Sequence, residues 1–267
     1  MNIAVSGAMG RMGKRICTLI IEEFKDLHLA AAIERHGHPS ASIDIGTLLG
    51  LPESIGVALI DRFEQLPGNV DVIIDFSTPE ATLKAAAFAA ENKIAFVTGT
   101  TGLSVKDKDT IKAMAEKIPC VMAPNMSVGI NLLLKILSQA ASIIGHDYDI
   151  EIVEAHHRLK KDAPSGTALR MAEVIAGSLN RDLEKVGVYT RKGLIGERTK
   201  TEIGIQTVRA GDIVGEHTVM FATGGERIEF THKASSRDTF ARGAIRAARW
   251  VYDKAPGRYD MQDVLGL

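Results

Sequence analysis

The sequence predicts an α/β fold in two parts, a parallel sheet wound with helices and then a smaller α+β domain with a mixed or antiparallel sheet. Up to about residue 127, short apolar runs alternate with helical patterns, which is typical of parallel strands joined by right-handed crossovers. A long apolar helix over residues 130–144 then ends at a glycine. From residue 201 to 232, strand-like runs follow one another with glycines at the turns, which favours a second kind of sheet.

Size and composition limit the possible functions. The chain has 267 residues, of which 45% are hydrophobic and 24% charged, so one or two globular domains are expected. A formal net charge of −1 argues against a nucleic-acid partner, and no apolar run is long enough to predict a membrane span. Neither a signal peptide nor a disulfide framework is indicated, since Cys17 and Cys120 both lie among apolar residues. A cytoplasmic protein is expected.

The first element is a buried strand over Asn2–Ser6, followed at once by a glycine-rich turn, Gly7–Gly13, and a helical pattern. Glycines let the backbone approach a pyrophosphate, and the N-terminus of the helix offers N–H donors. The spacing G-x-x-G-x-x-G differs from the commoner G-x-G-x-x-G, so the pattern alone is weak, and a bare turn without a ligand stays an alternative. In this context, the turn predicts a Rossmann-like dinucleotide site.

A second strand, Leu27–Ile33, ends at Glu34, which follows Gly13 by 21 residues. An acidic residue at this place can accept hydrogen bonds from the adenine ribose and favours NAD. The next residue, Arg35, and Arg11 in the glycine turn favour the phosphate of NADP. The pair therefore predicts use of NADH or NADPH, with a solvated loop pair as the alternative.

The remaining elements of the first half continue the alternation, although residues 37–67 predict no clear element beyond one short apolar run. The expected strands and helices are Val70–Ser77, Pro79–Asn92, Ile94–Thr98, Ser104–Lys117 and Pro119–Met122. Ligands bind beyond the carboxyl ends of parallel strands. The loops Gly99–Thr101 and Ala123–Met126 come at such ends, and they join Gly7 and Glu34 at one predicted edge.

In the second half, a strand over Tyr148–Ala155 predicts that Glu154 and His156 share a face and that His157 points the other way. A helix opens in Asp162–Thr167, and a final helix covers Arg237–Tyr252, with an arginine face that is expected to be solvated or salt-bridged. The apolar tail from residue 259 is expected to pack back onto the body.

The stretch from Glu151 to Ala168 concentrates the groups for acid–base chemistry. His156 and His157 are the only adjacent histidines, and Lys160 adds a positive donor. Gly166 and Thr167 lie in the first turn of a helix, where N–H groups favour a carboxylate. Structural histidines and a solvated basic loop are the alternatives, the latter being preferred for Lys161, and no metal site is expected. A dinucleotide domain beside these groups indicates reduction of an electron-poor double bond.

Six motifs spread over essentially the whole chain resemble the dihydrodipicolinate reductase family, whose members are 4-hydroxy-tetrahydrodipicolinate reductases. The motifs are VSGAMGRMG at 5–13, DFS at 75–77, GTTG at 99–102, APNMSVG at 123–129, EAHHRLKKDAPSGTA at 154–168 and YDMQDVLGL at 259–267. The resemblance implies an NADH- or NADPH-dependent reduction of a cyclic imine dicarboxylate with loss of water, on the diaminopimelate route to lysine.

The resemblance also implies roles for individual residues. His156 is the proton donor and acceptor, Lys160 is a proton donor, and His157, Gly166 and Thr167 bind substrate carboxylates. The residues implied in nucleotide binding are Gly7, Ala8, Met9, Gly10, Arg11, Met12, Glu34, Arg35, Gly99, Thr100, Thr101, Ala123, Pro124, Asn125 and Met126.

The domain division implied by the resemblance is a dinucleotide-binding domain, residues 1–127 completed by 238–267, and a substrate-binding and oligomerisation domain, residues 128–237. A homotetramer joined through the second sheet is implied, with a small dicarboxylate as substrate and neither nucleic acid nor membrane as partner. Two other readings stay open. One is a nucleotide sensor without catalysis, and the other is a Rossmann dehydrogenase for a different small acid.

Overall fold

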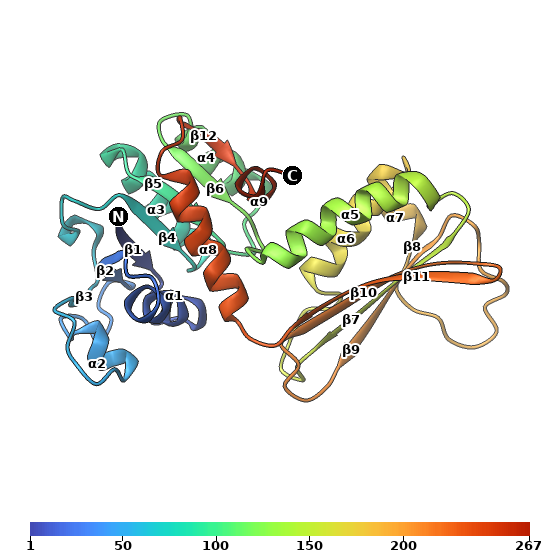
Figure 1. Cartoon of the computed structure of the whole chain (residues 1–267), viewed down its shortest axis with the longest axis horizontal. Coiled ribbons are helices and arrows are strands. Elements are labelled where there is room, and N and C mark those ends of the chain that lie inside the picture. Colours follow the sequence, from blue (N-terminus) through green and yellow to red (C-terminus); the bar gives the residue numbers. More distant parts are fainter. The chain divides into compact units, whose positions relative to one another are not determined.

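The computed structural model describes all 267 residues, and the chain divides into two compact units (Figure 1). Unit 1 consists of Met1–Val128 together with Arg237–Leu267, and unit 2 of Gly129–Ser236. The end of the chain therefore belongs to the same unit as its beginning.

Unit 1 contains a seven-stranded sheet in the order β12-β6-β5-β4-β1-β2-β3, in which all neighbours pair in parallel. Its strands are β1 Asn2–Ser6, β2 His28–Ile33, β3 Leu59–Ile60, β4 Val72–Asp75, β5 Ala95–Thr98, β6 Pro119–Met122 and β12 Gly257–Tyr259. The predicted parallel sheet is confirmed. Since every strand runs the same way, the carboxyl ends of β1, β2, β4, β5 and β6 meet at one edge.

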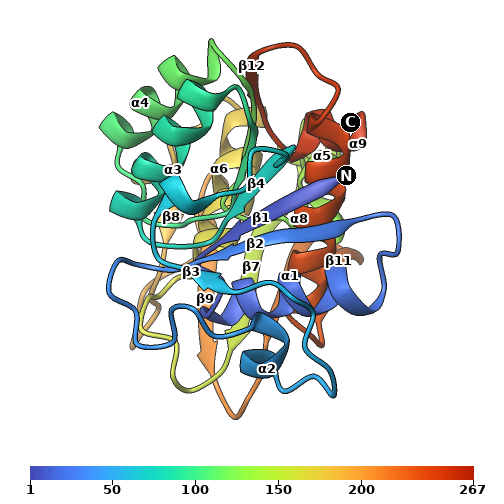
Figure 2. The ribbon, with the colours of Figure 1, turned by 90° about the vertical axis from the view of Figure 1, so that its left-hand side faces the viewer.

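Helices cover both faces of this sheet (Figure 2). They are α1 Arg11–Glu22, α2 Ile45–Leu49, α3 Pro79–Asn92, α4 Val105–Ala115, α8 Asp238–Val251 and α9 Met261–Leu265, with a 3-10 turn, η1, at Phe63–Gln65. Alternate strand residues face opposite cores: Val72 and Ile74 pack with α1 and α8, whereas Ile73 packs with α3 and α4. Burial on both faces explains why residues 72–74 of β4 form a continuous apolar run.

Side chains cap the starts of α2, α3, α4 and α9 in unit 1, whereas α1 and α8 have no side-chain cap. Thr78 caps α3 ahead of Pro79, and Ser104 forms a capping box with Asp107 at α4. Helix α1 begins after Gly10, which has no side chain to cap it, and has no acidic residue in its first turn. The first N–H groups of α1 are therefore left without a side-chain acceptor of this kind, as an anion site requires.

The structure adds three features that the sequence patterns did not predict. Residues 37–67 contain α2 and β3, and the carboxylate of Asp44 caps α2 by accepting from Thr47 N and also accepts from the backbone N–H groups of Ile55 and Val57. The tail supplies an edge strand, β12, as well as α9. Gly215, one of the glycines between residues 201 and 232 at which a turn was expected, is instead the first residue of a strand.

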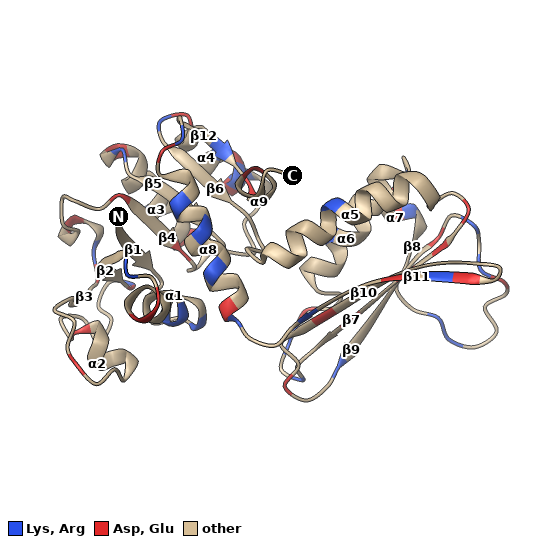
Figure 3. Cartoon of the chain, viewed as in Figure 1, with Lys and Arg blue, Asp and Glu red and all other residues tan.

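Basic residues recur along α8, where Figure 3 shows them in blue. Ion pairs connect this helix to α1 and to the segment that follows it. Arg242 pairs with Glu23 at 2.6 Å, Arg249 pairs with Asp26, and Asp238 receives two bonds from the Arg15 guanidinium. These contacts confirm the expected salt-bridged face. Nowhere does the fold contain a helix with both the length and the apolar character that crossing a bilayer demands.

Unit 2 contains a five-stranded mixed sheet in the order β11-β10-β7-β9-β8, as predicted. Strands β7, β8 and β9 pair in parallel, and β10 is antiparallel to both of its neighbours. The strands are β7 Asp149–His156, β8 Gly187–Val188, β9 Ile203–Arg209, β10 Gly215–Thr223 and β11 Glu226–Ala234, and the helices are α5 Val128–Ile144, α6 Gly166–Ser178 and α7 Leu183–Val186.

One face of this sheet forms the core of unit 2. Ile150 and Ile152 of β7 pack with Leu137 of α5 and Met171 of α6. Burial alternates strictly along β7, so Glu154 and His156 continue the covered row. No helix of unit 2 lies over the opposite face in Figure 1.

Candidate active site

The glycine turn of unit 1 has a conformation that only small residues allow. Gly7 has φ +73°, and its N–H and that of Ala8 both donate to Ile33 O, at 3.0 and 3.1 Å. A Cβ atom at Gly13 would lie 2.1 Å from the carbonyl oxygen of Gly7. Glycine at position 13 therefore lets the turn lie directly against the start of α1.

Glu34 lies against this turn. Its Oε1 accepts from Met9 N at 2.9 Å, and its Oε2 accepts from Arg35 N at 3.2 Å. The Arg35 side chain is exposed beside it. Glu34 is expected to contact the adenine ribose, and Arg35 is expected to contact the phosphate of NADP. Both thus follow β2 at the same edge as the turn that follows β1.

Unit 1 has a cavity of about 340 Å³ at the carboxyl edge of its sheet. Eight of the predicted nucleotide residues line it, namely Arg11, Met12, Gly99, Thr100, Thr101, Pro124, Asn125 and Met126. Seven others do not, namely Gly7, Ala8, Met9, Gly10, Glu34, Arg35 and Ala123. The side chains of Ala8 and Ala123 are buried in the core, so only their backbones are available to a ligand.

Three lining residues were missed by sequence reasoning: Phe76, Ser77 and Phe240. Phe76 occupies the space beside position 99, since a Cβ there would lie 2.1 Å from its ring. The signal was present, because an apolar strand ending in Asp-Phe-Ser places polar groups at the ligand-binding edge.

Asp75 organises the loops around this cavity. Its carboxylate is fully buried and accepts from the hydroxyl groups of Ser77, Thr82, Thr98 and Thr100, at 2.6 to 3.2 Å. The Thr100 hydroxyl also accepts from Ser77 N at 3.0 Å. Asp75 therefore couples the loop after β4 to the loop after β5.

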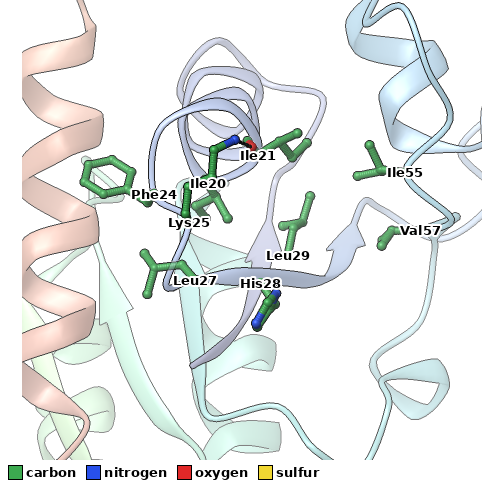
Figure 4. A pocket seen from close by; sticks show the side chains of 9 residues that line it. All are labelled: Ile20, Ile21, Phe24, Lys25, Leu27, His28, Leu29, Ile55 and Val57. Carbon is green, nitrogen blue, oxygen red and sulfur yellow. Dashed lines mark hydrogen bonds between the residues drawn. The ribbon is translucent and has the colours of Figure 1, made fainter.

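A separate hollow of about 280 Å³ in unit 1 contains none of the predicted site residues (Figure 4). Apolar side chains from α1, β2 and the segment before β3 line most of it, including Ile20, Leu29 and Val57. Only Lys25 and His28 contribute ionisable groups, so this hollow lacks the set of polar groups that orients a charged substrate.

In unit 2, a buried carboxylate lies beside the first histidine of the pair. His156 is 9% exposed, and its Nδ1 lies 2.6 Å from Oε2 of Glu154, which is completely buried. Arg209 donates two hydrogen bonds to the same carboxylate, at 2.7 and 2.8 Å. Ser165 N and the Thr207 hydroxyl donate to Oε1, at 3.0 and 3.2 Å.

These donors determine the charge of Glu154. Burial alone would raise the pKa of this carboxyl, but the hydrogen bonds from Arg209, His156 and Ser165 outweigh burial and lower the pKa to about 2. Glu154 is therefore ionised at neutral pH. Sequence reasoning placed it on the same face as His156 but gave it no role.

Two histidines of this site, His156 and His217, have pKa values below the usual one. Burial lowers the pKa of His156 below its usual value, although Glu154 opposes this effect. His217 is 4% exposed and packs edge-on against His156, with ring centroids 5.2 Å apart. Burial lowers the pKa of His217 to about 3, and the Ser165 hydroxyl lies 3.1 Å from its Nε2.

The other predicted substrate residues lie close along the chain. Lys160 Nζ is 2.9 Å from Asp162 Oδ2, and its side chain is 21% exposed. His157 lies just beyond β7, and its Nδ1 is buried without a protein partner. Ser165 caps α6, and Gly166 follows it on an open surface where a Cβ would meet nothing within 4 Å. Lys161 is exposed, as expected.

We expect unit 2 to lose stability as the pH falls from 6.5 to 3. The folded pKa of His217 lies below its unfolded value of 6.5, so the unfolded chain binds the extra proton in this window. The free energy of unfolding should fall by about 1.4 kcal/mol per pH unit from this group. Glu154 adds a loss between pH 4.5 and 2, because its folded pKa is also depressed.

The measurement is urea unfolding at pH 7, 5 and 4. Far-UV circular dichroism follows both units, whereas fluorescence of Trp250, the single tryptophan, follows unit 1. His217→Phe should flatten the dependence between pH 6.5 and 4, and the exposed His146→Gln should not. An unchanged slope in His217→Phe would contradict this account.

A parallel sheet with a glycine turn at a helix start, and an acid at the end of the next strand, defines a dinucleotide-binding unit. Combined with a second unit that carries a buried carboxylate–histidine pair and a lysine, it defines the class of nicotinamide-dependent oxidoreductases. The chain belongs to the dihydrodipicolinate reductase family. The model of that family's N-terminus matches residues 1–126, and the model of its C-terminus matches residues 129–265. The predicted resemblance is confirmed.

Curated relatives match over the whole length. A 4-hydroxy-tetrahydrodipicolinate reductase of Syntrophus aciditrophicus is 54% identical over 263 residues, which is 98% of this chain and 97% of that protein. One of Hahella chejuensis is 54% identical over 266 residues, covering 100% and 99%. Another, of Geobacter sulfurreducens, is 52% identical over 266 residues, again covering 100% and 99%.

Solved structures share the fold. A dipicolinate-bound dihydrodipicolinate reductase from a Paenisporosarcina species has a TM-score of 0.77 at 24% identity, covering 98% of both chains. An amine dehydrogenase from Mycobacterium smegmatis has a TM-score of 0.61 at 12% identity, covering 97% of this chain and 94% of that one.

Proposed function

We propose that this protein is a 4-hydroxy-tetrahydrodipicolinate reductase in lysine and diaminopimelate biosynthesis. It reduces (4S)-4-hydroxy-2,3,4,5-tetrahydrodipicolinate to 2,3,4,5-tetrahydrodipicolinate, with loss of water. The observation that carries the proposal is the full-length identity of about half to curated reductases, which includes both units.

The coenzyme, NADH or NADPH, supplies the hydride when it is bound. The residues of unit 1 fit its pyrophosphate, because α1 starts at an uncapped glycine without an acid in its first turn. Gly7–Met12 would hold the phosphates, and Glu34 would accept from the adenine ribose. Arg35 is exposed beside Glu34 and would meet a 2′-phosphate. Gly99–Thr101 and Ala123–Met126 would position the rest of the coenzyme along the edge of the sheet.

Unit 2 supplies the protons. We assign His156 as the residue that gives and takes a proton and Lys160 as a proton donor. Two contacts support these assignments. The imidazole of His156 pairs with Glu154, the ammonium of Lys160 pairs with Asp162, and both side chains are partly shielded from solvent. Held proton-transfer groups of this kind contribute about 10² to 10⁴-fold to a rate.

The carboxylates of the substrate require positive or N–H partners. His157 has a buried Nδ1 without a protein partner, and Gly166 and Thr167 begin α6, where the helix dipole favours an anion. Gly166 keeps the surface there open, since it has no side chain. These three residues are the proposed carboxylate ligands.

The domain roles follow from these assignments. Residues 1–127, completed by 238–267, form the dinucleotide-binding domain, and residues 128–237 form the substrate-binding and oligomerisation domain. The boundaries lie within one residue of those of the two compact units.

The test is oxidation of NADH and NADPH by the purified protein with freshly made product of a dihydrodipicolinate synthase. Turnover with at least one coenzyme, inhibited by pyridine-2,6-dicarboxylate, is expected. A protein that binds NADPH but never oxidises it would be the sensor, and turnover without this inhibition would indicate a different acid as substrate. The ratio of kcat/KM with the two coenzymes measures the balance between Glu34, which favours NADH, and Arg35, which favours NADPH.

We further propose a cytoplasmic homotetramer that is joined through the uncovered face of the second sheet. Val208, an apolar residue of β9 on that face, is 42% exposed in the single chain. Light scattering after size-exclusion chromatography should give four times the chain mass. Val208→Glu should lower it, and a monomeric wild type would refute the proposal.

A further inference from the structure

Glu154 lies at the centre of a polar row on the covered face of the second sheet. His217 of β10 is its direct partner on one side, and Thr207 of β9 is its partner on the other. The next row pairs His156 with Arg209. Every group that contacts His156 from the strands is therefore held by the ladder of the sheet rather than by a loop.

The bonds of Glu154 decide which nitrogen of His156 carries the proton. A carboxylate that receives two bonds from a guanidinium, one from a backbone N–H and one from a hydroxyl is ionised and can only accept. At 2.6 Å from this acceptor, Nδ1 of His156 must be the donor. When the ring is neutral, Nε2 then has the lone pair.

We propose that Glu154 is the positioning residue for His156: it holds the imidazole in the Nδ1–H tautomer, so that Nε2 is the nitrogen that exchanges protons with the substrate. The expected effect on kcat rests on the proposed function, whereas the expected tautomer of His156 does not. The family motifs assign no role to Glu154, which is the first residue of the motif at 154–168.

Arg209 has a second part in this arrangement, because it offsets the charge of Glu154. The charged and titratable groups that face His156 are Glu154 on its own strand, Arg209 on β9, His217 on β10 and Lys160 after β7. Two further groups contact the neighbours of His156 instead of the ring itself. Asp162 pairs with Lys160, and His232 lies opposite His217 on β11.

Glu154 alone would favour a protonated ring, but burial and the positive charges of Lys160 and Arg209 lower the pKa of His156. The ring therefore rests in its neutral form at neutral pH. It must take up a proton at Nε2 before it can give one.

The experiment is ¹⁵N NMR of the full-length chain labelled at histidine, of which it has eight. The resonances of His156 are assigned by their loss in His156→Gln. At pH 8 the wild type should show a protonated Nδ1 and an unprotonated Nε2. Glu154→Gln should shift the ring toward the other tautomer and lower kcat by about 10² to 10⁴-fold, because a wrong tautomer removes the reacting lone pair. The KM and Kd for NADH should stay unchanged.

Matched variants keep the test decisive. Glu151→Gln removes a carboxylate from the same strand that pairs with Arg191 and Arg198 instead, and it should alter neither the tautomer nor kcat. If Glu154→Gln does not fold because Arg209 is left unpaired, the double variant Glu154→Leu/Arg209→Met removes both charges together and should show the same loss of tautomer and of kcat.

Two results would overturn the proposal. One is a wild-type ring protonated at Nε2, and the other is a Glu154 variant that keeps full turnover after its tautomer has changed. If the protein does not reduce the substrate at all, the proposed function fails, while the tautomer measurement still decides the role of Glu154.

Discussion

His156→Gln lowers kcat by about 10² to 10⁴-fold, the contribution of a positioned proton-transfer group. Glutamine keeps a side chain of similar length that can still bond Glu154, but it cannot take up and release a proton at neutral pH. Because His156 lies in unit 2 and the proposed nucleotide-binding residues lie in unit 1, the Kd for NADH should stay nearly the same. Steady-state kinetics and a fluorescence titration with NADH measure the two quantities.

The control is His146→Gln, an exposed histidine of the same unit, which should keep wild-type turnover. Wild-type kcat in His156→Gln would refute the catalytic role. A joint loss of turnover and NADH binding would instead indicate that the substitution damages the fold.

Lys160→Ala lowers kcat and also raises the KM for the dicarboxylate substrate. Removing the ammonium takes away a proton donor, which costs about 10²-fold in rate, and a charged hydrogen bond, which is worth about 1.5 to 3 kcal/mol. The second term corresponds to a rise in KM of roughly ten-fold or more. Both parameters should therefore change, whereas in His156→Gln mainly kcat should.

Lys161→Ala is the matched control, since the neighbouring lysine is exposed and should alter neither parameter by more than a few tenths of a log unit. Equal effects of the two substitutions would mean that the basic segment acts only by its summed charge. An unchanged profile in Lys160→Ala would remove this residue from the mechanism.

Local chemistry made much of the fold predictable. Residues 72–74 of β4 are buried on both faces and are all apolar, and the helices that begin after Thr78 and Ser104 follow capping rules that act within one turn. The strict alternation of β7 likewise placed Glu154 and His156 on one face. Residues 37–67 were not predictable, because α2 and β3 are short and depend on bonds from Asp44 to residues 11 and 13 positions away.

The site divides in the same way. The glycine turn and the His-His-Lys segment are each a short run of the sequence, and Glu34 follows the turn at a typical spacing. Residue types and spacing were therefore enough to single them out. Phe76, Ser77 and Phe240 line the cavity only because strands β1, β4 and β5 lie side by side and α8 returns from the end of the chain.

The sequence by itself determined the class of fold and the family, and it singled out the stretch from Glu151 to Ala168 to which we assign the proton chemistry, since each depends on patterns within short segments. Only the tertiary structure decided how His156 is held. Arg209 is 55 residues from Glu154 and His217 is 52 from Ser165 along the chain, and pairing of β7 with β9 and β10 brings them together in a buried place. The hydrogen bonds gathered there keep Glu154 ionised against the effect of burial, whereas burial lowers the pKa of His156 and His217. The ionised carboxylate in turn sets which nitrogen of His156 is free to react.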